Sequence, residues 1–269
     1  MPAASPPLPV AAASWAEDLD LIAQVAVRAG EIAAEHFHRG VRHWVKDGDS
    51  PVSEADMAVN HFLAEELARA RPDYGWLSEE SENDPARLQR PRVFIVDPID
   101  GTRGFIKGSD EWTISIAVAE GAEVRAGVIR NPLKGESFTA TSGGGAHCNG
   151  AVLKVTERAR IEGARVAAAK GAVRPLGAAA EQLQRSYIPS LAYRFALVAR
   201  GDFDASLSAG NAHEWDIAAA SLIVEEAGGR VTHEDGRRPG FNKAQPTVGP
   251  LIAAGATLHA ALRKQYATG

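Results

Sequence analysis

The sequence predicts a mixed fold of the α/β (α+β) class, and three patterns along its 269 residues support this prediction. Apolar residues recur at helical spacing near the N-terminal end, short apolar runs followed by acids come next, and strand-like and helix-like segments alternate after about residue 155. Hydrophobic residues make up 45% of the chain, which is enough for a large core in one or two domains. We expect a disordered tail over residues 1–13, an N-terminal α+β subdomain over 14–155 and a C-terminal α/β subdomain over 156–269.

The first two predicted elements are helices, and each has a capping sequence at its start. Residues 15–38 place apolar side chains close to helical spacing, and Ser14 with Glu17 has the pattern of a capping box. A second helix is expected to begin near Ser53 and to end before Pro72.

Short apolar runs predict the strands, and acidic residues follow the first two of these runs. Buried strands are expected at 74–77 and 93–96. Because α/β folds build their sites where strand ends converge, the acids that follow both runs are expected to lie together. The further predicted elements are strands at 112–118, 124–129 and 136–141, a turn at 143–145, a helix at 191–199, a strand at 203–207, a helix at 217–227, a strand at 251–253 and a helix at 257–266.

Five carboxylates in three short segments have the pattern of a site for divalent cations. Carboxylates repel one another in a small space, and a hard cation such as Mg²⁺ supplies the compensating charge through oxygen ligands. Two such ions side by side can clamp the attacking and the leaving oxygen of a phosphate ester. The pattern therefore predicts a metal-dependent phosphatase, and its oxygen donors favour magnesium or manganese over zinc. The three segments are Leu77–Ser81, Asp97–Thr102 and Trp215–Asp216.

The same segments resemble the inositol monophosphatase superfamily. D-P-I-D-G-T at 97–102 followed by W-D at 215–216 is similar to the family pattern, and S-P-V-S-E-A-D at 50–56 is similar to its S-P-V-T-x-A-D segment. Further similar segments extend the resemblance over almost the whole chain. It implies a layered α/β/α/β/α sandwich of the inositol monophosphatase / fructose-1,6-bisphosphatase type. It also implies a phosphomonoesterase that uses two or three Mg²⁺ ions, for which Mn²⁺ can substitute, with lithium inhibition and a homodimer as further family properties.

The resemblance assigns the metal ligands to the acids and to one backbone carbonyl. Pro98 stiffens its turn and holds Asp97 in an extended conformation, which exposes the carbonyl of Ile99 as a further hard oxygen. By resemblance, Asp97 bridges two ions. The alternatives are a plain turn at Asp97, a solvated pair of glutamates, and an N-cap role for Asp216 before the predicted helix. The implied ligands are Glu79, Asp97, Ile99, Asp100 and Asp216, with Glu80 as a further candidate.

The resemblance also implies that Asp56 and Thr102 form the catalytic pair, together with Glu79. A hydroxyl held by a carboxylate can accept a proton from a water whose pKa a metal ion has lowered, and the hydroxide would attack phosphorus in line. For Asp56 the alternative is a partner of the helix dipole. The amides of Gly101 and Thr102, at an expected helix start, would hold phosphate oxygens. Lys46 stands where the family carries a lysine near a third ion, and a surface lysine is its alternative.

Three branches of the superfamily compete for the substrate: inositol-phosphate, histidinol-phosphate and 3'(2'),5'-bisphosphate nucleotide phosphatases, the last called CysQ-like. F-I-K at 105–107 with E-W-T at 111–113 is similar to the CysQ-like pattern, and Ala209 replaces the glutamate that holds inositol hydroxyls. We therefore expect a bisphosphate nucleotidase that converts adenosine 3',5'-bisphosphate to AMP. The alternatives are an inositol-1-monophosphatase or broad sugar phosphatase, then a histidinol-phosphatase, and from another class a catalytically dead metal-binding regulator.

Two basic residues are the candidates for binding a second phosphate. Arg194 stands where CysQ-like chains have a lysine, and a fixed guanidinium there would bind a phosphate bidentately. Its alternative is a surface arginine. Lys170 would substitute for the charge of an S-R-S-H segment that this chain lacks, and Pro189–Ser190 departs from the family's Gly-Ser. The expected substrate contacts are Gly101, Thr102, Lys170, Arg194 and Asp216, with Glu214 as a further candidate.

Composition and charge exclude several other classes. A net charge of -5 argues against a basic nucleic-acid surface, so the expected partner is a small phosphorylated metabolite and not a nucleic acid polymer. The single cysteine, Cys148, excludes an internal disulfide framework. Residues 1–13 lack the regions of a signal peptide, and no apolar run reaches the roughly 18–20 residues of a membrane span, so a cytoplasmic protein without a membrane partner is expected. The histidines show no metal-type spacing, and His213 is expected at the surface or behind the ligands.

Overall fold

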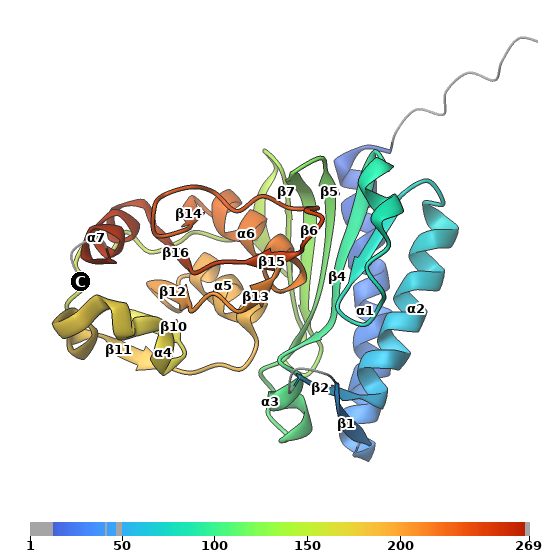
Figure 1. Cartoon of the computed structure of the whole chain (residues 1–269), viewed down its shortest axis with the longest axis horizontal. Coiled ribbons are helices and arrows are strands. Elements are labelled where there is room, and N and C mark those ends of the chain that lie inside the picture. The colour runs from blue at the N-terminus through green and yellow to red at the C-terminus, as the bar shows by residue number, and fades with distance from the viewer. Residues whose placement is uncertain (1–12, 41, 47–49, 267–269) are drawn as a thin grey trace, which may run out of the picture.

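The computed structural model describes residues 13–40, 42–46 and 50–266. Helices and sheets alternate in five layers, which is the predicted α/β/α/β/α sandwich (Figure 1). The expected disordered tail lies outside the described residues, except for residue 13. In order, the layers are α1 (Trp15–Arg39) with α2 (Glu54–Ala70), a seven-stranded sheet, α5 (Leu191–Arg200) with α6 (Glu214–Glu226), a five-stranded sheet, and α7 (Ala256–Tyr266) with the short α4 (Lys170–Val173).

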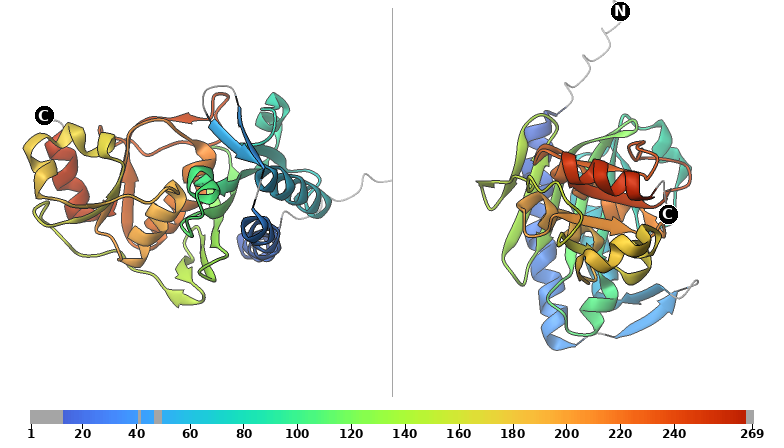
Figure 2. Two further views of the ribbon diagram at one scale, coloured as in Figure 1. Left: turned by 90° about the horizontal axis from the view of Figure 1, so that it is seen from below. Right: turned by 90° about the vertical axis from the view of Figure 1, so that its left-hand side faces the viewer.

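Both N-terminal helices begin at the predicted capping boxes. The amide of Glu17 donates to Ser14 Oγ at 3.2 Å, and the amide of Ser14 donates to Glu17 Oε2 at 2.7 Å. Ser53 and Asp56 form the same reciprocal pair at the start of α2. The two helices cover the face of the large sheet that points away from the second sheet (Figures 1 and 2). The two predicted helix starts are therefore confirmed. Reciprocal capping bonds specify where a helix begins, which is why the sequence could predict them.

The seven-stranded sheet contains the five strands predicted before residue 142 and two further strands. β3 is parallel to β4, and every other neighbouring pair is antiparallel. The second strand of this sheet continues past its predicted end to Asp100, with irregular pairing between Asp97 and Asp100. Pro98 has no N–H for the ladder, which explains the irregularity. In sheet order the strands are β3 (Gly75–Ser78), β4 (Arg92–Asp100), β5 (Thr113–Glu120), β6 (Glu123–Asn131), β7 (Glu136–Thr141), β8 (Gly145–Cys148) and β9 (Ala151–Val152).

The five-stranded sheet was only partly predicted. Its third and fourth strands were expected, whereas the others are short segments of small, basic and polar residues that owe their strand conformation to pairing with neighbours. The first strand and the third are both parallel to the second, and the remaining pairs are antiparallel. In sheet order the strands are β11 (Gln184–Ser186), β10 (Arg165–Ala168), β12 (Ala205–Ser208), β16 (Leu251–Gly255) and β14 (Gly229–Thr232).

The central helix α6 begins three residues before its predicted start, and this corrects the interpretation of Asp216. Asp216 does not precede the helix as an N-cap. It is the third helical residue, and its Oδ2 accepts the amide N–H of His213 at 2.7 Å. The bond closes the first turn from inside the helix. The aspartate is therefore oriented by the helix start and not only by the preceding loop.

The two central helices share one hydrophobic core with both sheets. This cluster contains Leu77 and Ile95 from the large sheet, Phe195 and Ile223 from the helices, and Ala253 from the small sheet. The expected subdomain boundary near residue 155 lies in the chain between the two sheets. Since one hydrophobic core joins both sheets, the division into subdomains stays a prediction. None of the helices in the described part of the chain has both the length and the apolar composition that a bilayer crossing requires.

The remaining short elements lie mainly at the edges of the layers. A two-stranded ribbon and the short helix α3 lie together at one end of the large sheet (Figures 1 and 2). This is the end where β4 delivers its acids. The elements are the ribbon of β1 (His43–Lys46) and β2 (Ser50–Ser53), α3 (Thr102–Ile106), a pair of β13 (Ala212–His213) and β15 (Thr247–Val248), and the 3-10 helices η1 (Pro85–Gln89) and η2 (Arg174–Gln182).

Candidate active site

The fold brings three aspartates from distant parts of the chain into one cluster. Asp97, Asp100 and Asp216 each offer a carboxylate oxygen, and these oxygens all lie within 4.8 Å of one another. Asp97 is 1% exposed and Asp100 is 7% exposed. Burial raises the pKa of Asp97 and Asp216 well above the ordinary value, and the charges of neighbouring carboxylates raise it further. Such an all-oxygen set is costly alone and fits a hard divalent cation.

The carboxylates are oriented by hydrogen bonds from backbone and side chains. Asp97 Oδ1 accepts the amide of Ile99 at 3.0 Å. Asp100 Oδ2 accepts the hydroxyl of Ser190 at 2.5 Å and the amide of Ala192 at 2.6 Å, at the start of α5. Burial raises the pKa of Asp100, and these two bonds oppose the rise. The start of α5 therefore holds one oxygen of Asp100 in place.

The paired glutamates separate in space. Glu79 lines the cavity that contains the aspartate cluster, and after burial its charge is the largest cause that raises the pKa of Asp97. Glu80 does not line this cavity. Its backbone carbonyl accepts the side-chain amide of Asn60 at 3.2 Å, and its charge raises the pKa of Asp56. Glu79 is thus the glutamate placed to join the cluster.

Asp56 and Thr102 lie in hydrogen-bond contact beside the cluster, as the predicted catalytic pair requires. Thr102 Oγ1 is 3.1 Å from Asp56 Oδ1 and 3.0 Å from the carbonyl of Ile99. Asp56 Oδ2 also accepts the amide of Ser53 at 2.8 Å and its hydroxyl at 2.5 Å. Burial raises the pKa of Asp56 to about 6. The carboxylate therefore both caps α2 and holds the threonine hydroxyl.

Gly101 stands at the N-cap of α3 with a positive φ of 95°. A side chain there would be strained, and its Cβ would lie 3.1–3.2 Å from atoms of Ser190. This close approach is what lets the loop after β4 reach the start of α5.

Two neighbouring cavities meet at this cluster. The first has a volume of about 450 Å³, and the second has a volume of about 270 Å³. They share four lining residues: Asp100, Pro189, Asn211 and Asp216. The first is also lined by Pro51, Glu79, Asp97, Ile99, Gly101, Thr102, Arg103, Tyr187, His213 and Trp215, and the second by Ala169, Ala172, Leu191, Arg194, Leu207, Ser208, Ala209 and Ala212.

Arg194 lies in the smaller cavity and is only 7% exposed, so the surface-arginine alternative is wrong. Its Nε donates to the carbonyl of Ile188 at 2.6 Å, and a terminal nitrogen lies 3.4 Å from the carbonyl of Pro189. Ala209, expected at the position of the inositol-binding glutamate, lines the same cavity. The cavity therefore holds one fixed cation and no carboxylate from position 209.

Two other candidates, Lys170 and Glu214, do not line either cavity, and the side chain of a third, Lys46, is not described. Lys170 is exposed at the start of α4, and its role stays a prediction. Glu214 is buried, and its side chain accepts the amides of Asn242 at 2.6 Å and Lys243 at 3.0 Å, so it holds that loop. Lys46 belongs to β1, but its side chain lies outside the described structure.

The structure adds residues to which the sequence pattern assigned no role in the site. His213 was expected at the surface or behind the ligands, but it lines the larger cavity and its ring stacks on Trp215 at 4.6 Å. Tyr187, Asn211 and Ser190 also reach the cluster or its cavity. No local motif marks Tyr187 or Asn211, whereas Ser190 belongs to the segment that departs from the family's Gly-Ser, and His213 stands close to the W-D pair.

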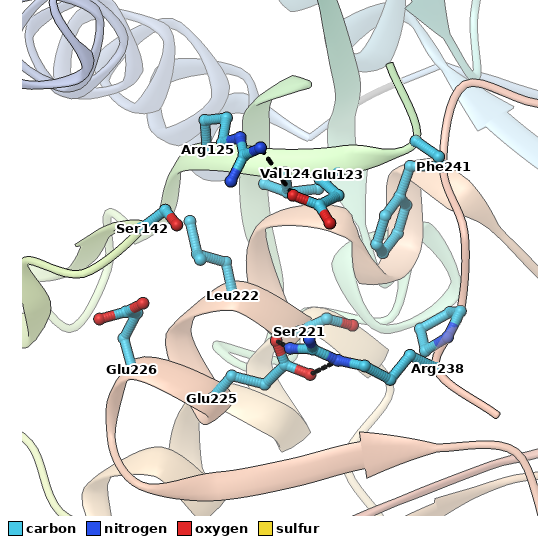
Figure 3. Close-up of a pocket in the computed structure, with 12 residues that line it drawn as sticks. Glu123, Val124, Arg125, Ser142, Ser221, Leu222, Glu225, Glu226, Arg238 and Phe241 are labelled. Atoms are coloured by element: carbon cyan, nitrogen blue, oxygen red, sulfur yellow. Dashed lines mark hydrogen bonds and ion pairs between the residues drawn. The ribbon is translucent and has the colours of Figure 1, made fainter. Parts of the chain in front are cut away.

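Another cavity of about 540 Å³ lies beside the C-terminal half of α6, away from the aspartate cluster (Figure 3). Its charged groups are neutralised within the protein. Glu225 pairs with Arg238, Glu123 pairs with Arg125 at 2.7 Å, and Glu226 accepts two backbone amides of the turn at 143–145. Among the described residues, the carboxylates of this cavity do not form a metal-type cluster of the kind formed by Asp97, Asp100 and Asp216.

Comparisons with known proteins identify the family of this chain. The model of the inositol monophosphatase family matches residues 15–267. The chain is 32% identical over 266 residues to inositol-1-monophosphatase of Mesorhizobium japonicum, with 90% of this chain and 95% of that protein covered. It is 29% identical to the 3'(2'),5'-bisphosphate nucleotidase CysQ of Aggregatibacter actinomycetemcomitans, with 88% and 91% covered.

The fold also matches that of a solved structure. The extragenic suppressor protein suhB from Bartonella henselae superimposes with a TM-score of 0.84 at 30% identity, over 94% of this chain and 99% of that chain. Relatives named for different activities therefore have similar identity to this chain, and identity alone does not separate them. The match over nearly the whole chain, together with the aspartate cluster, shows that this protein belongs to the inositol monophosphatase family of phosphatases.

Proposed function

We propose that this protein is a magnesium-dependent phosphomonoesterase that converts adenosine 3',5'-bisphosphate to AMP and inorganic phosphate. The observation that carries the proposal is the cluster of Asp97, Asp100 and Asp216 beside a second cavity with a buried guanidinium. The cluster supports hydrolysis of one phosphate ester. Arg194 in the adjoining cavity supports a substrate with a second phosphate.

The residues that would hold Mg²⁺ are Glu79, Asp97, Asp100, Asp216 and the carbonyl of Ile99. Their donors are all oxygens, as this ion prefers, and Mn²⁺ would accept the same set. When bound, the metal lowers the pKa of a water and offsets the charge on the leaving oxygen. The protein supplies the orientation of these oxygens through the bonds to Asp97, Asp100 and Asp216.

Thr102 and Asp56 would move the proton. The attacking water gives a proton to Thr102 Oγ1 while the hydroxyl proton of Thr102 passes to Asp56 Oδ1, 3.1 Å away. A carboxylate with a pKa of about 6 is well suited to accept a proton near neutral pH. The water oxygen bonds to phosphorus, and the ester oxygen leaves with the bonding electrons and takes up a proton from solvent water. The amides of Gly101 and Thr102 would orient the phosphate oxygens.

Arg194 would bind the second phosphate in the smaller cavity. A guanidinium has five N–H donors in a rigid fork, and here two of its nitrogens face the carbonyls of Ile188 and Pro189. These contacts fix the orientation of the fork before any substrate arrives. Preorganisation of this kind lowers the entropic cost of binding an anion.

The test is Mg²⁺-dependent phosphate release from adenosine 3',5'-bisphosphate, inositol 1-phosphate and histidinol phosphate, measured side by side with the full chain. We expect kcat/KM for the bisphosphate to exceed the others by roughly tenfold or more, which corresponds to about 1.4 kcal/mol. Asp97→Asn is the inactive control. Preference for inositol phosphate would replace the nucleotidase proposal with the inositol-type alternative, and release from none of the esters would favour the regulator.

A further inference from the structure

An exposed aromatic ring stands at the wall of the catalytic cavity. Tyr187 lines this cavity and is 57% exposed, although large apolar and aromatic side chains are usually covered. It directly follows β11 and belongs to the loop that leads to Ser190, which holds Asp100. The ring therefore belongs to a loop that contacts the aspartate cluster, and it is still accessible to a ligand.

Arg194 fixes this ring from one side. Its guanidinium lies over the Tyr187 ring at 5.2 Å from the centroid, and the same guanidinium holds the carbonyls of Ile188 and Pro189. One buried arginine thus positions both the ring and the backbone that carries it. Since more than half of the side chain is exposed, a second planar group can reach the ring without displacing Arg194.

The cavity wall offers further aromatic surface. His213 and Trp215 also line the cavity, and their rings stack at 4.6 Å with an interplanar angle of 6°. Flat aromatic surfaces bind bases by stacking, whatever the hydrogen-bonding pattern of the base. A polyol such as inositol has no aromatic face, and its hydroxyls require polar partners. The wall is therefore better matched to a base than to a polyol.

We propose that Tyr187 is a specificity-determining residue that stacks on the base of a bisphosphate nucleotide while the scissile phosphate lies at the aspartate cluster. This inference rests on the proposed function and adds the residue that recognises the nucleoside part. Arg194 then has two tasks, because it supports the ring and faces the second phosphate. The phenol hydroxyl is not required for stacking.

The test compares adenosine 3',5'-bisphosphate with 1-O-methylribose 3,5-bisphosphate, which keeps both phosphates and lacks the base. The readout is the ratio of kcat/KM for the nucleotide to kcat/KM for the abasic ester. We expect Tyr187→Ala to lower this ratio by roughly tenfold to a hundredfold, as the loss of one stacking contact predicts. Tyr187→Phe keeps the ring and should keep the ratio within about twofold.

Val152→Ala is the matched control, since Val152 is exposed and lines neither cavity. An unchanged ratio in Tyr187→Ala, in a wild-type enzyme that prefers the bisphosphate, would overturn the stacking role and leave the nucleotidase proposal intact. If the ratio is unchanged because both kcat/KM values fall by the same factor, Tyr187 supports Arg194 and does not recognise the base. A wild-type enzyme that does not hydrolyse the nucleotide would overturn both proposals.

Discussion

The two carboxylate oxygens of Asp56 have different partners. Oδ2 accepts both donors of Ser53 and caps α2, whereas Oδ1 is free for the hydroxyl of Thr102. The capping bonds keep the carboxylate ionised more readily than burial alone would allow, but burial is the larger effect. The pKa of Asp56 therefore lies close to the operating pH, as a proton acceptor needs.

The first prediction concerns the pH dependence of kcat. Asp56 accepts a proton only when ionised, and its pKa of about 6 lies above the ordinary value, so activity should fall as pH decreases through this region. A bound cation would move this acid limb to lower pH. Asp56→Asn should reduce kcat by roughly 10²–10⁴-fold, the range of general base catalysis. Thr102→Ser should retain far more activity than Thr102→Val, and equal loss in both would contradict the proton path.

The second prediction concerns Asp97 without and with metal. Asp97→Asn keeps the acceptor for the Ile99 amide and removes a buried charge that its neighbours repel. Without Mg²⁺ the variant should be more stable than the wild type, because a buried charge next to other carboxylates is removed. Addition of Mg²⁺ should raise the Tm of the wild type but not that of the variant. Thermal melts with and without the ion decide this, and a variant with an undiminished Mg²⁺ response would contradict the ligand assignment.

At the scale of elements, the start of α5 joins helix stability to the site. Ser190 Oγ accepts the amide of Tyr193 at 2.9 Å as an N-cap, and it also donates to Asp100. A third partner, Thr113 of β5, lies 3.0 Å away. The helix cap therefore also supports Asp100, a proposed metal ligand. The cap of α1 at Ser14 has the same local chemistry but lies far from the cluster in the fold (Figure 1).

The third prediction uses these two caps as a matched pair. Ser190→Ala and Ser14→Ala should each destabilise the protein by about 0.5–2 kcal/mol, because each removes an N-cap. Only Ser190→Ala should also lower kcat/KM and weaken Mg²⁺ binding, since Asp100 loses a donor. Denaturant unfolding and Mg²⁺ titration of activity separate the two effects. Similar kinetic losses in both variants would mean that the cap acts through general stability.

At the scale of the whole molecule, one loop connects the two sheets near the site. The side chain of Glu214 accepts the amides of residues 242 and 243, and Arg87 of η1 donates to Asn242 Oδ1 and, at 2.7 Å, to the carbonyl of Lys243. Arg87 is 2% exposed although it is charged. It links the segment beside β3 to the loop that anchors the start of α6. The position of Asp216 thus depends on contacts far along the chain.

The fourth prediction concerns this connection. Arg87→Ala leaves buried acceptors without a donor and should destabilise the protein by on the order of 3 kcal/mol. Arg90→Ala, an exposed arginine three residues further on, should change stability by less than about 0.5 kcal/mol. Urea unfolding of both variants gives the comparison. A small effect of Arg87→Ala would show that the loop is held mainly by Glu214.

The sequence by itself determined the elements whose signals are local. Capping boxes located α1 and α2, continuous apolar runs located β3 and β4, and the D-P-x-D and W-D motifs identified the acids, because each signal depends on residues a few positions apart. Only the tertiary structure decided which side chains complete the site. Tyr187 and Asn211 have no distinguishing local pattern, and they line the cavity because the loops that lead into α5 and α6 come to the end of β4. Contacts of this kind are set by the shared core between the sheets, which no short segment encodes alone.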